Sequence, residues 1–131
     1  MCIRDSIYTT APPAAICAAA LESLRIIRDE PRRRVHLADL ARMTRARLAE
    51  EGLDTRDSVS QIIPVVIGPE APALEISRRL LEEEFLVPAI RPPTVARGTS
   101  RLRVSLSAAH DTDDIERFIE SLASAVRAAQ L

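Results

Sequence analysis

The sequence predicts an α+β fold in which helices pack on one face of a small, mainly antiparallel sheet of three strands. Two observations carry this prediction. Four segments have apolar residues at the three- and four-residue spacing of a helix, and three shorter segments are apolar or alternate between apolar and polar residues. Their order along the chain is helix, helix, strand, helix, strand, strand, helix, which favours helices gathered on one face of an antiparallel sheet.

The first helix is expected to begin after Pro12 and Pro13, because proline is tolerated in the first turn of a helix. The sequence Asp29-Glu30-Pro31 ends it. One apolar stripe runs along this helix and consists of Ile16, Ala20, Leu24 and Ile27.

The other three helices are expected at 32–51, at 71–84 and after Asp111. Gly52 is a suitable stop for the first of these three, since glycine adopts the left-handed conformation that often ends a helix. Asp111 is a suitable N-cap for the last one, because its carboxylate can accept from backbone N–H groups of the first turn.

Strands are expected at 61–67, at 85–90 and around 102–106. Pro64 lies inside the first strand and has no N–H for a neighbouring strand, so it predicts an edge position or a bulge. In the last strand, apolar residues alternate with Arg101 and Arg103, whose side chains we expect to pair with nearby glutamates.

The segment RPPTVARGT joins the last two strands and holds the candidate binding residues. Pro92 and Pro93 predict a stiff, extended connector, and a stiff connector would fix Arg91 and Thr94 at its ends. A guanidinium pairs with a carboxylate through two parallel hydrogen bonds, so Arg91 is a candidate carboxylate clamp. The alternative is a surface arginine paired with a helix glutamate. For Thr94, a hydroxyl that binds substrate competes with one that bonds its own backbone.

Composition excludes several functional classes. The 131 residues fit one domain, and 18 basic against 19 acidic residues give a net charge of −1, which provides no overall attraction for nucleic acid or anionic membranes. The three arginines at 32–34 are therefore predicted to be a solvated helix start beside Asp29 and Glu30 and not a nucleic-acid patch. No apolar run is long enough to span a bilayer, and two cysteines and two histidines form no metal motif. We expect no signal peptide and a cytoplasmic location.

All the basic residues are arginine, so the chain has no lysine for a Schiff base or for a phosphate-binding loop. Residues 1–6, MCIRDS, fit nothing that follows them and are expected to be a non-native scar.

The stretches YTTAPPAA, IIPVVIG and LVPAIRPPTVARGTSRLRVSLSAAH resemble the C-terminal part of the α-oxoamine synthases, which are pyridoxal-phosphate enzymes of the aminotransferase fold type I. The resemblance covers 7–131. Within the family, AIRPPTV followed by GT-x-RLR most resembles the branch that condenses L-alanine with a pimeloyl thioester, with decarboxylation, in biotin biosynthesis. Ala96 departs from the family pattern, in which proline is expected.

The resemblance implies roles for four residues. Arg91 would grip the amino-acid carboxylate and Thr94 would contact the substrate. In a homodimer, Thr9 and Thr10 would reach the pyridoxal phosphate of the partner subunit, although their position before a helix equally suits an N-cap region. The acyl donor would be pimeloyl-CoA or pimeloyl-acyl carrier protein.

The resemblance also implies that the chain is a fragment, because the family's Schiff-base lysine precedes this region. Residues 7–31 would end the large domain and form a connecting helix, and 32–131 would form the C-terminal small domain. Alone, the fragment should be inactive. Two alternatives remain: another α-oxoamine synthase, of the glycine C-acetyltransferase or aminolevulinate synthase type, and a non-catalytic α+β module that binds a small ligand or a partner protein.

Overall fold

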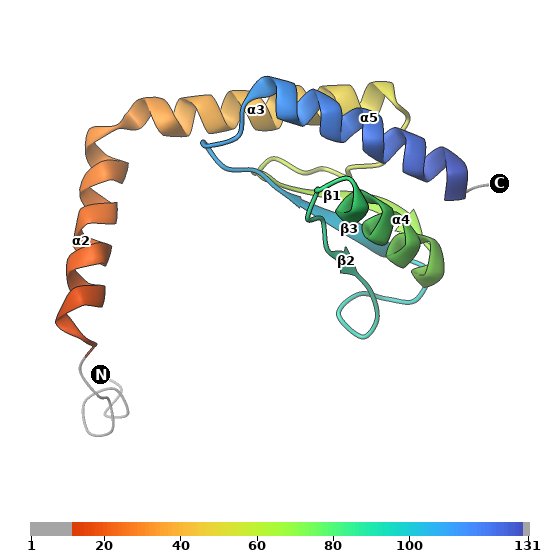
Figure 1. The fold of residues 1–131 in the computed structure, drawn as a ribbon, viewed down its shortest axis with the longest axis horizontal. Coiled ribbons are helices and arrows are strands. Elements are labelled where there is room, and N and C mark those ends of the chain that lie inside the picture. Colours follow the sequence, from red (N-terminus) through yellow and green to blue (C-terminus); the bar gives the residue numbers. More distant parts are fainter. Residues whose placement is uncertain (1–11, 130–131) are drawn as a thin grey trace. The chain divides into compact units, whose positions relative to one another are not determined.

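The computed structural model of the chain describes residues 12–129 (Figure 1). Their contacts divide the chain into two compact units, 1–34 and 35–131. The elements are, in order, α2 (Ala14–Asp29), α3 (Pro31–Glu50), β1 (Ile62–Gly68), α4 (Glu70–Glu82), β2 (Ala89–Ile90), β3 (Ser100–Ser105) and α5 (Thr112–Ala129).

In the first unit, α2 begins after Pro13 and ends at Asp29, as predicted. The side chains of Ile16, Leu24 and Ile27 on its apolar stripe are between 55% and 62% exposed. The guanidinium of Arg33 donates to Glu30 at 2.8 Å, and Arg32 lies 3.5 Å from the same carboxylate. The arginine run is therefore solvated, as its sequence predicted, and Arg32 and Arg33 pair with Glu30, while Arg34 donates to the backbone carbonyl of Ile27.

The second unit is built on a sheet with the order β1-β3-β2, and both pairings are antiparallel. Ile63 lies opposite Val104, and Val65 lies opposite Leu102. β1 is an edge strand with an irregularity between Val66 and Gly68. The edge position agrees with the prediction from Pro64, whose missing N–H is tolerated there, whereas Pro64 itself pairs in regular register with Arg103.

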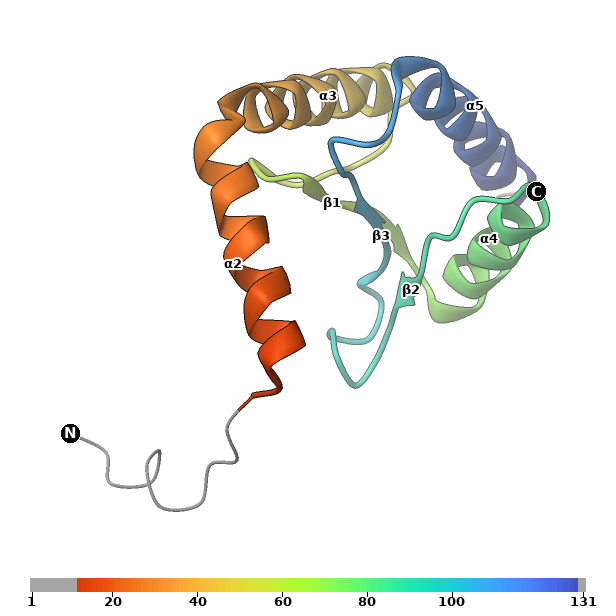
Figure 2. The same ribbon diagram turned by 60° about the vertical axis from the view of Figure 1, so that its left-hand side comes forward.

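Helices cover one face of this sheet, as the sequence predicted. Side chains at alternate positions of β1 and β3 are buried, and these are Ile63, Val65, Leu102 and Val104. They pack against apolar residues of the helices, including Leu48, Ile76, Leu80, Ile119 and Leu122. Figure 2 shows α4 and α5, which contact each other, on this side of the sheet. On the opposite face Arg103 is exposed, so one side of the sheet carries the core.

The predicted strand 85–90 is wrong over most of its length, because only Ala89–Ile90 pairs as β2. Residues 85–87 instead close the end of α4. The N–H of Phe85 donates to Leu80 O at 2.8 Å, and the Ser77 hydroxyl donates to Val87 O at 2.6 Å. The Phe85 ring also packs edge-on against Phe118, with centroids 5.6 Å apart. The N–H of Phe85 and the carbonyl of Val87 are therefore bonded to α4 and do not pair with a neighbouring strand.

The caps read from the sequence are present. The Asp111 carboxylate accepts from the backbone N–H of Asp114 at 2.8 Å and so begins α5. At the end of α3, Gly52 has a φ of +74°, and the N–H of Leu53 returns to Leu48 O at 2.9 Å.

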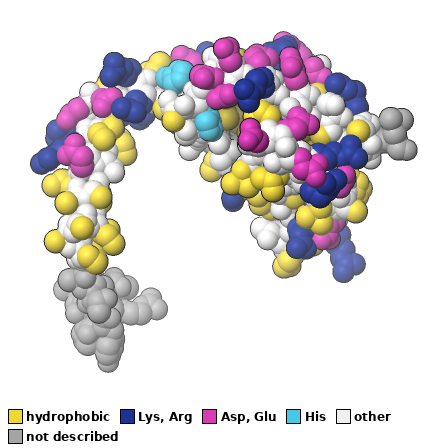
Figure 3. Space-filling model, viewed as in Figure 1, with side chains coloured by type: hydrophobic (Ala, Val, Ile, Leu, Met, Phe, Trp, Pro, Cys, Tyr) yellow, Lys and Arg dark blue, Asp and Glu magenta, His cyan; other side chains and the backbone are white. Residues whose placement is uncertain are grey.

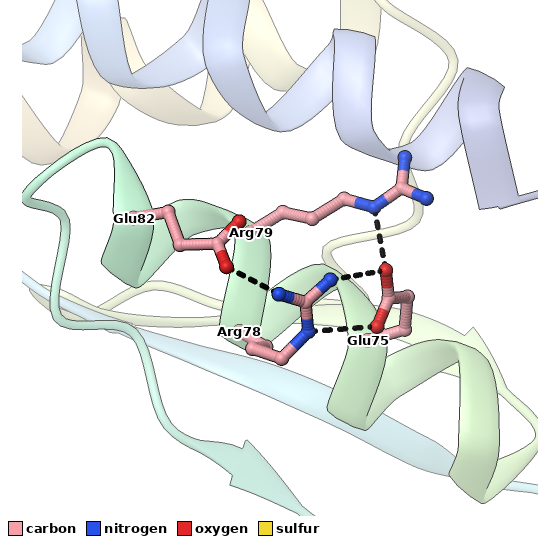
Figure 4. A network of polar contacts seen from close by, with 4 residues as sticks. All are labelled: Glu75, Arg78, Arg79 and Glu82. Atoms are coloured by element: carbon pink, nitrogen blue, oxygen red, sulfur yellow. Dashed lines mark hydrogen bonds and ion pairs between the residues drawn. The ribbon is translucent and has the colours of Figure 1, made fainter.

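A network of charged side chains runs along the exposed face of α4 (Figure 4). Arg78 donates to Glu75 through both Nε, at 3.0 Å, and Nη2, at 2.8 Å, and its Nη1 contacts Glu82. The Nε of Arg79 donates to the same Glu75 carboxylate at 2.7 Å. The hydrogen bonds from Arg78, and then those from Arg79, lower the pKa of Glu75 from 4.5 to about 2.

Glu75→Gln is expected to lower stability at neutral pH by an amount that disappears in acid. A carboxyl whose pKa falls on folding stabilises the fold above its unfolded pKa and loses this contribution as the pH falls through the folded pKa. The stability difference from the parent should therefore be constant above about pH 5 and shrink between pH 4.5 and about 2. Urea unfolding across this range measures it. Glu120→Gln, at an exposed site on α5, serves as the control. A difference that stays constant through acid would contradict the coupling.

Leu122→Ala is expected to destabilise the second unit by about 2–5 kcal/mol, because it leaves a cavity at a fully buried position. Ser124→Ala, two residues further on the exposed side of α5, should change stability by less than about 0.5 kcal/mol. Urea denaturation followed by circular dichroism compares the two. Equal effects would mean that this face of α5 is not packed in the core.

Candidate carboxylate-binding site

Arg91 directly follows β2, whose short pairing with β3 fixes the backbone before it. Ala89 lies opposite Leu102, and Ile90 lies opposite Arg101. The Arg91 side chain is 50% exposed. The sheet therefore anchors the main chain of this residue while its guanidinium reaches solvent.

Residues 91–94 form a tight turn, so the predicted extended connector is wrong. The peptide between Pro92 and Pro93 is cis, and the N–H of Thr94 donates to Arg91 O at 3.0 Å. Proline restricts its own φ and that of the residue before it, which favours an extended chain, but here the backbone hydrogen bond from Thr94 to Arg91 closes a turn. The turn brings Arg91 and Thr94 together, and both are exposed.

Arg91 forms an ion pair with Glu70, the first residue of α4. Its Nη1 donates to Glu70 Oε1 at 2.9 Å, and the Glu70 side chain is 45% exposed. This is the helix-glutamate pairing that was the alternative for Arg91, so the site combines a candidate clamp with an acidic partner. Sequence reasoning missed Glu70 because the two residues are 21 positions apart. The one available signal was an acid at the start of a helix, just after Gly68 and Pro69.

The rest of the connector is held by its own polar groups. The Thr99 hydroxyl donates to Ala96 O at 2.8 Å. Arg101 donates to Thr99 O at 3.1 Å and to Thr99 Oγ1 at 3.3 Å. The expected pairing of Arg101 with a glutamate is therefore wrong, because the adjacent loop supplies its acceptors.

The other predicted site residues, Thr9 and Thr10, lie outside the described residues. Within residues 12–129 no group of three or more potential ligands is arranged to hold a metal ion. No helix in that range has the length and apolarity that crossing a membrane requires. The chain has no lysine, so its residues cannot anchor pyridoxal phosphate covalently through a side-chain amine.

A cavity of about 440 Å³ lies at the other end of β3, between the segment 84–87 and the start of α5. Neither Arg91 nor Thr94 lines it. His110 is one of its lining residues, and its Nδ1 accepts from the backbone N–H of Ser107 at 3.3 Å. This hydrogen bond fixes the histidine in the loop between β3 and α5.

The family model described as aminotransferase class I and II matches residues 2–122. The match covers most of the chain. The chain belongs to the aminotransferase class I and II family.

Curated relatives of the chain are named 8-amino-7-oxononanoate synthase, and two of them show the extent of the similarity. The protein from Methylococcus capsulatus is 51% identical over 123 residues, which make up 94% of this chain and 32% of the relative. The protein from Thioalkalivibrio sulfidiphilus is 46% identical over 127 residues, which make up 97% of this chain and 32% of the relative. The chain thus spans about a third of the length of the curated relatives it matches.

Solved structures of the same family superpose closely. Serine palmitoyltransferase from Sphingomonas wittichii matches with a TM-score of 0.90 and 29% identity, over 97% of this chain and 32% of that one. The 8-amino-7-oxononanoate synthase from Francisella tularensis matches with a TM-score of 0.81 and 25% identity, over 98% of this chain and 37% of that one. These neighbours agree with the predicted small-domain fold.

Proposed function

We propose that this chain is the C-terminal portion of an 8-amino-7-oxononanoate synthase, a pyridoxal-phosphate enzyme that condenses L-alanine with a pimeloyl thioester and releases carbon dioxide in biotin biosynthesis. The observation that carries the proposal is the 51% identity to a synthase of this name across 94% of the chain. The location in the cell would be the cytoplasm, and the acyl donor would be pimeloyl-CoA or pimeloyl-acyl carrier protein.

In this proposal Arg91 binds the carboxylate of L-alanine. Three features support it: the main chain is anchored by β2, the guanidinium is half exposed, and a planar guanidinium matches a carboxylate with two hydrogen bonds. A fixed carboxylate sets the orientation of the amino acid and so of its Cα–H bond. Thr94, at the other end of the turn, would donate its hydroxyl to the same substrate.

Pyridoxal phosphate would supply the electron sink for loss of the substrate's proton and carboxylate. Because this chain has no lysine, the covalent attachment would come from the part of the synthase outside this sequence. Thr9 and Thr10 would contact the cofactor phosphate of the partner subunit in a homodimer.

Residues 7–31 would belong to the end of the large domain and to a connecting helix. The exposed stripe of α2 supports this assignment, since a row of large apolar side chains normally packs against another surface.

A second candidate is another member of the α-oxoamine synthases. The superposition on serine palmitoyltransferase, with a TM-score of 0.90, favours it, but the identity is 29%. The higher identity to the curated synthases ranks this candidate second. Comparing L-alanine with glycine and L-serine as substrates of the full-length enzyme separates the two.

Arg91→Ala in the full-length synthase is expected to lower kcat/KM for L-alanine by roughly 10- to 1,000-fold, because two charge-assisted hydrogen bonds to the carboxylate are lost. Arg91→Lys should recover part of this loss, since an ammonium cannot reproduce the planar pair of donors. The cofactor absorbance should be unchanged in both variants. Steady-state kinetics with varied L-alanine measures the effect.

Arg127→Ala is the matched control for this experiment. Arg127 is also an exposed arginine paired with a glutamate, with Nη1 at 3.1 Å from Glu51 Oε2, but it lies on α5. Its removal should leave kcat/KM within about twofold. If Arg91→Ala behaves like Arg127→Ala, Arg91 is a surface residue and the carboxylate is bound elsewhere.

The 131-residue chain by itself is expected to associate in solution through the α2 stripe. Leu24→Glu should reduce this association, whereas Ser23→Glu, at the neighbouring exposed position, should not. Size-exclusion chromatography with light scattering measures the masses. A parent chain that runs as a single monomeric species would count against the assignment of 7–31 to a larger domain.

A further inference from the structure

We propose that Glu70 is a positioning residue for amino-acid binding: its carboxylate holds one nitrogen of the Arg91 guanidinium, so that the remaining donors are turned toward the substrate carboxylate. This inference rests on the proposed function, in which Arg91 binds L-alanine. It adds a residue from α4 to a site otherwise formed by the connector between β2 and β3.

The contact between the two side chains uses only part of the guanidinium. Nη1 of Arg91 donates to Glu70 Oε1 at 2.9 Å, and within residues 12–129 this is the hydrogen bond that the Arg91 side chain forms. A guanidinium has five N–H donors, and its Nε and Nη2 together match the two oxygens of a carboxylate. Glu70 therefore occupies one nitrogen and leaves the Nε–Nη2 edge for a second carboxylate.

Two other arginines of the chain bind two carboxylates in this same way. Arg78 holds Glu75 through Nε and Nη2 while its Nη1 contacts Glu82, as Figure 4 shows. Arg47 holds Glu116 through Nε and Nη2, each at 3.2 Å from Oε2, while its Nη1 contacts Glu50. In both, one acid sits on Nη1 and the other on the Nε–Nη2 edge. The Arg91–Glu70 pair reproduces the Nη1 half of this arrangement.

Glu70 and Arg91 both lie on backbone that secondary structure holds in place. Glu70 is the first residue of α4, and the buried side chains of Ala73, Ile76 and Leu80 pack this helix into the core. A carboxylate in the first turn is also favoured by the helix dipole. Arg91 follows β2, which is paired with β3. A hydrogen bond between two anchored positions restricts the many rotamers of the arginine.

This restriction predicts which step of the reaction a change of Glu70 affects. Ordering a free arginine side chain opposes binding, and a guanidinium already held in place has lost part of that freedom before the substrate arrives. An exposed ion pair contributes little to stability, so loss of Glu70 should not unfold the protein. The effect should be on the affinity for the amino acid and not on the chemical step.

The test is made in the full-length synthase with Glu70→Ala and Glu70→Gln. Glu70→Ala should raise KM for L-alanine by about 3- to 20-fold, with kcat and KM for the pimeloyl thioester within about twofold of the parent. Glu70→Gln should lie between the parent and Glu70→Ala, because its amide oxygen still accepts from Nη1. Calorimetric titration with L-alanine, without the thioester, should show the same weakening of binding. Adding Glu70→Ala to Arg91→Ala should cause no further loss.

Glu82→Ala is the matched control, because Glu82 is an exposed acid of the same helix that contacts the Nη1 of a different arginine. Its KM for L-alanine should stay at the parent value. An unchanged or lowered KM in Glu70→Ala, with Arg91→Ala still defective, would overturn the role of Glu70 alone. A normal KM and kcat in Arg91→Ala would overturn the proposed role of Arg91 in binding L-alanine together with this inference. Glu70→Gln preserves the side-chain shape, and circular dichroism verifies that each variant is folded.

Discussion

The antiparallel pairing of β1 with β3 is the constraint on which the rest of the second unit depends. It places Ile63 opposite Val104 and Val65 opposite Leu102, and all four side chains are buried on the same face. A shift by one residue would turn these side chains outward and leave the helices without a surface to pack on. β2 adds only two residues to the other side of β3, yet those two residues anchor Arg91. The position of the candidate site thus follows from a register set mainly by the two longer strands.

Several arginines of this chain pair with glutamates of the helices, whereas Arg91 lies at the end of a strand. Arg47, Arg78 and Arg79 donate to glutamates on or between helices. Exposed pairs of this kind contribute little free energy, so their value lies in fixing the directions of side chains. Arg91 differs in its place, since it stands at the end of a strand beside a tight turn. In the same surroundings a lysine would offer a point charge without fixed donor directions.

Local patterns allowed most of the fold to be predicted from the sequence. Periodic apolar residues located the helices, Pro64 located the edge strand, and Asp111 marked the start of α5. The errors arose where tertiary contacts override a local preference. Phe85 and Val87 read as strand residues, but one packs on Phe118 and the other accepts from Ser77. In the site, the sequence predicted Arg91 and Thr94, whereas the closed turn depends on a backbone hydrogen bond and the partner Glu70 on a contact between distant segments.

The outer edge of β1 has a consequence for how this domain behaves in a crowded solution. Gln61 O accepts from the N–H of Leu106 on the side of β3, so the backbone groups of Ile62, Pro64 and Val66 face the outer edge of the sheet. The N–H of Ile62 donates to Ser60 Oγ at 3.1 Å, that of Val66 donates to Asp54 O at 2.9 Å, and Pro64 has none. An invading strand would therefore find no free amide donor at Ile62, Pro64 or Val66. These three positions make edge-to-edge pairing, the usual first step of sheet aggregation, less favourable on this side of β1.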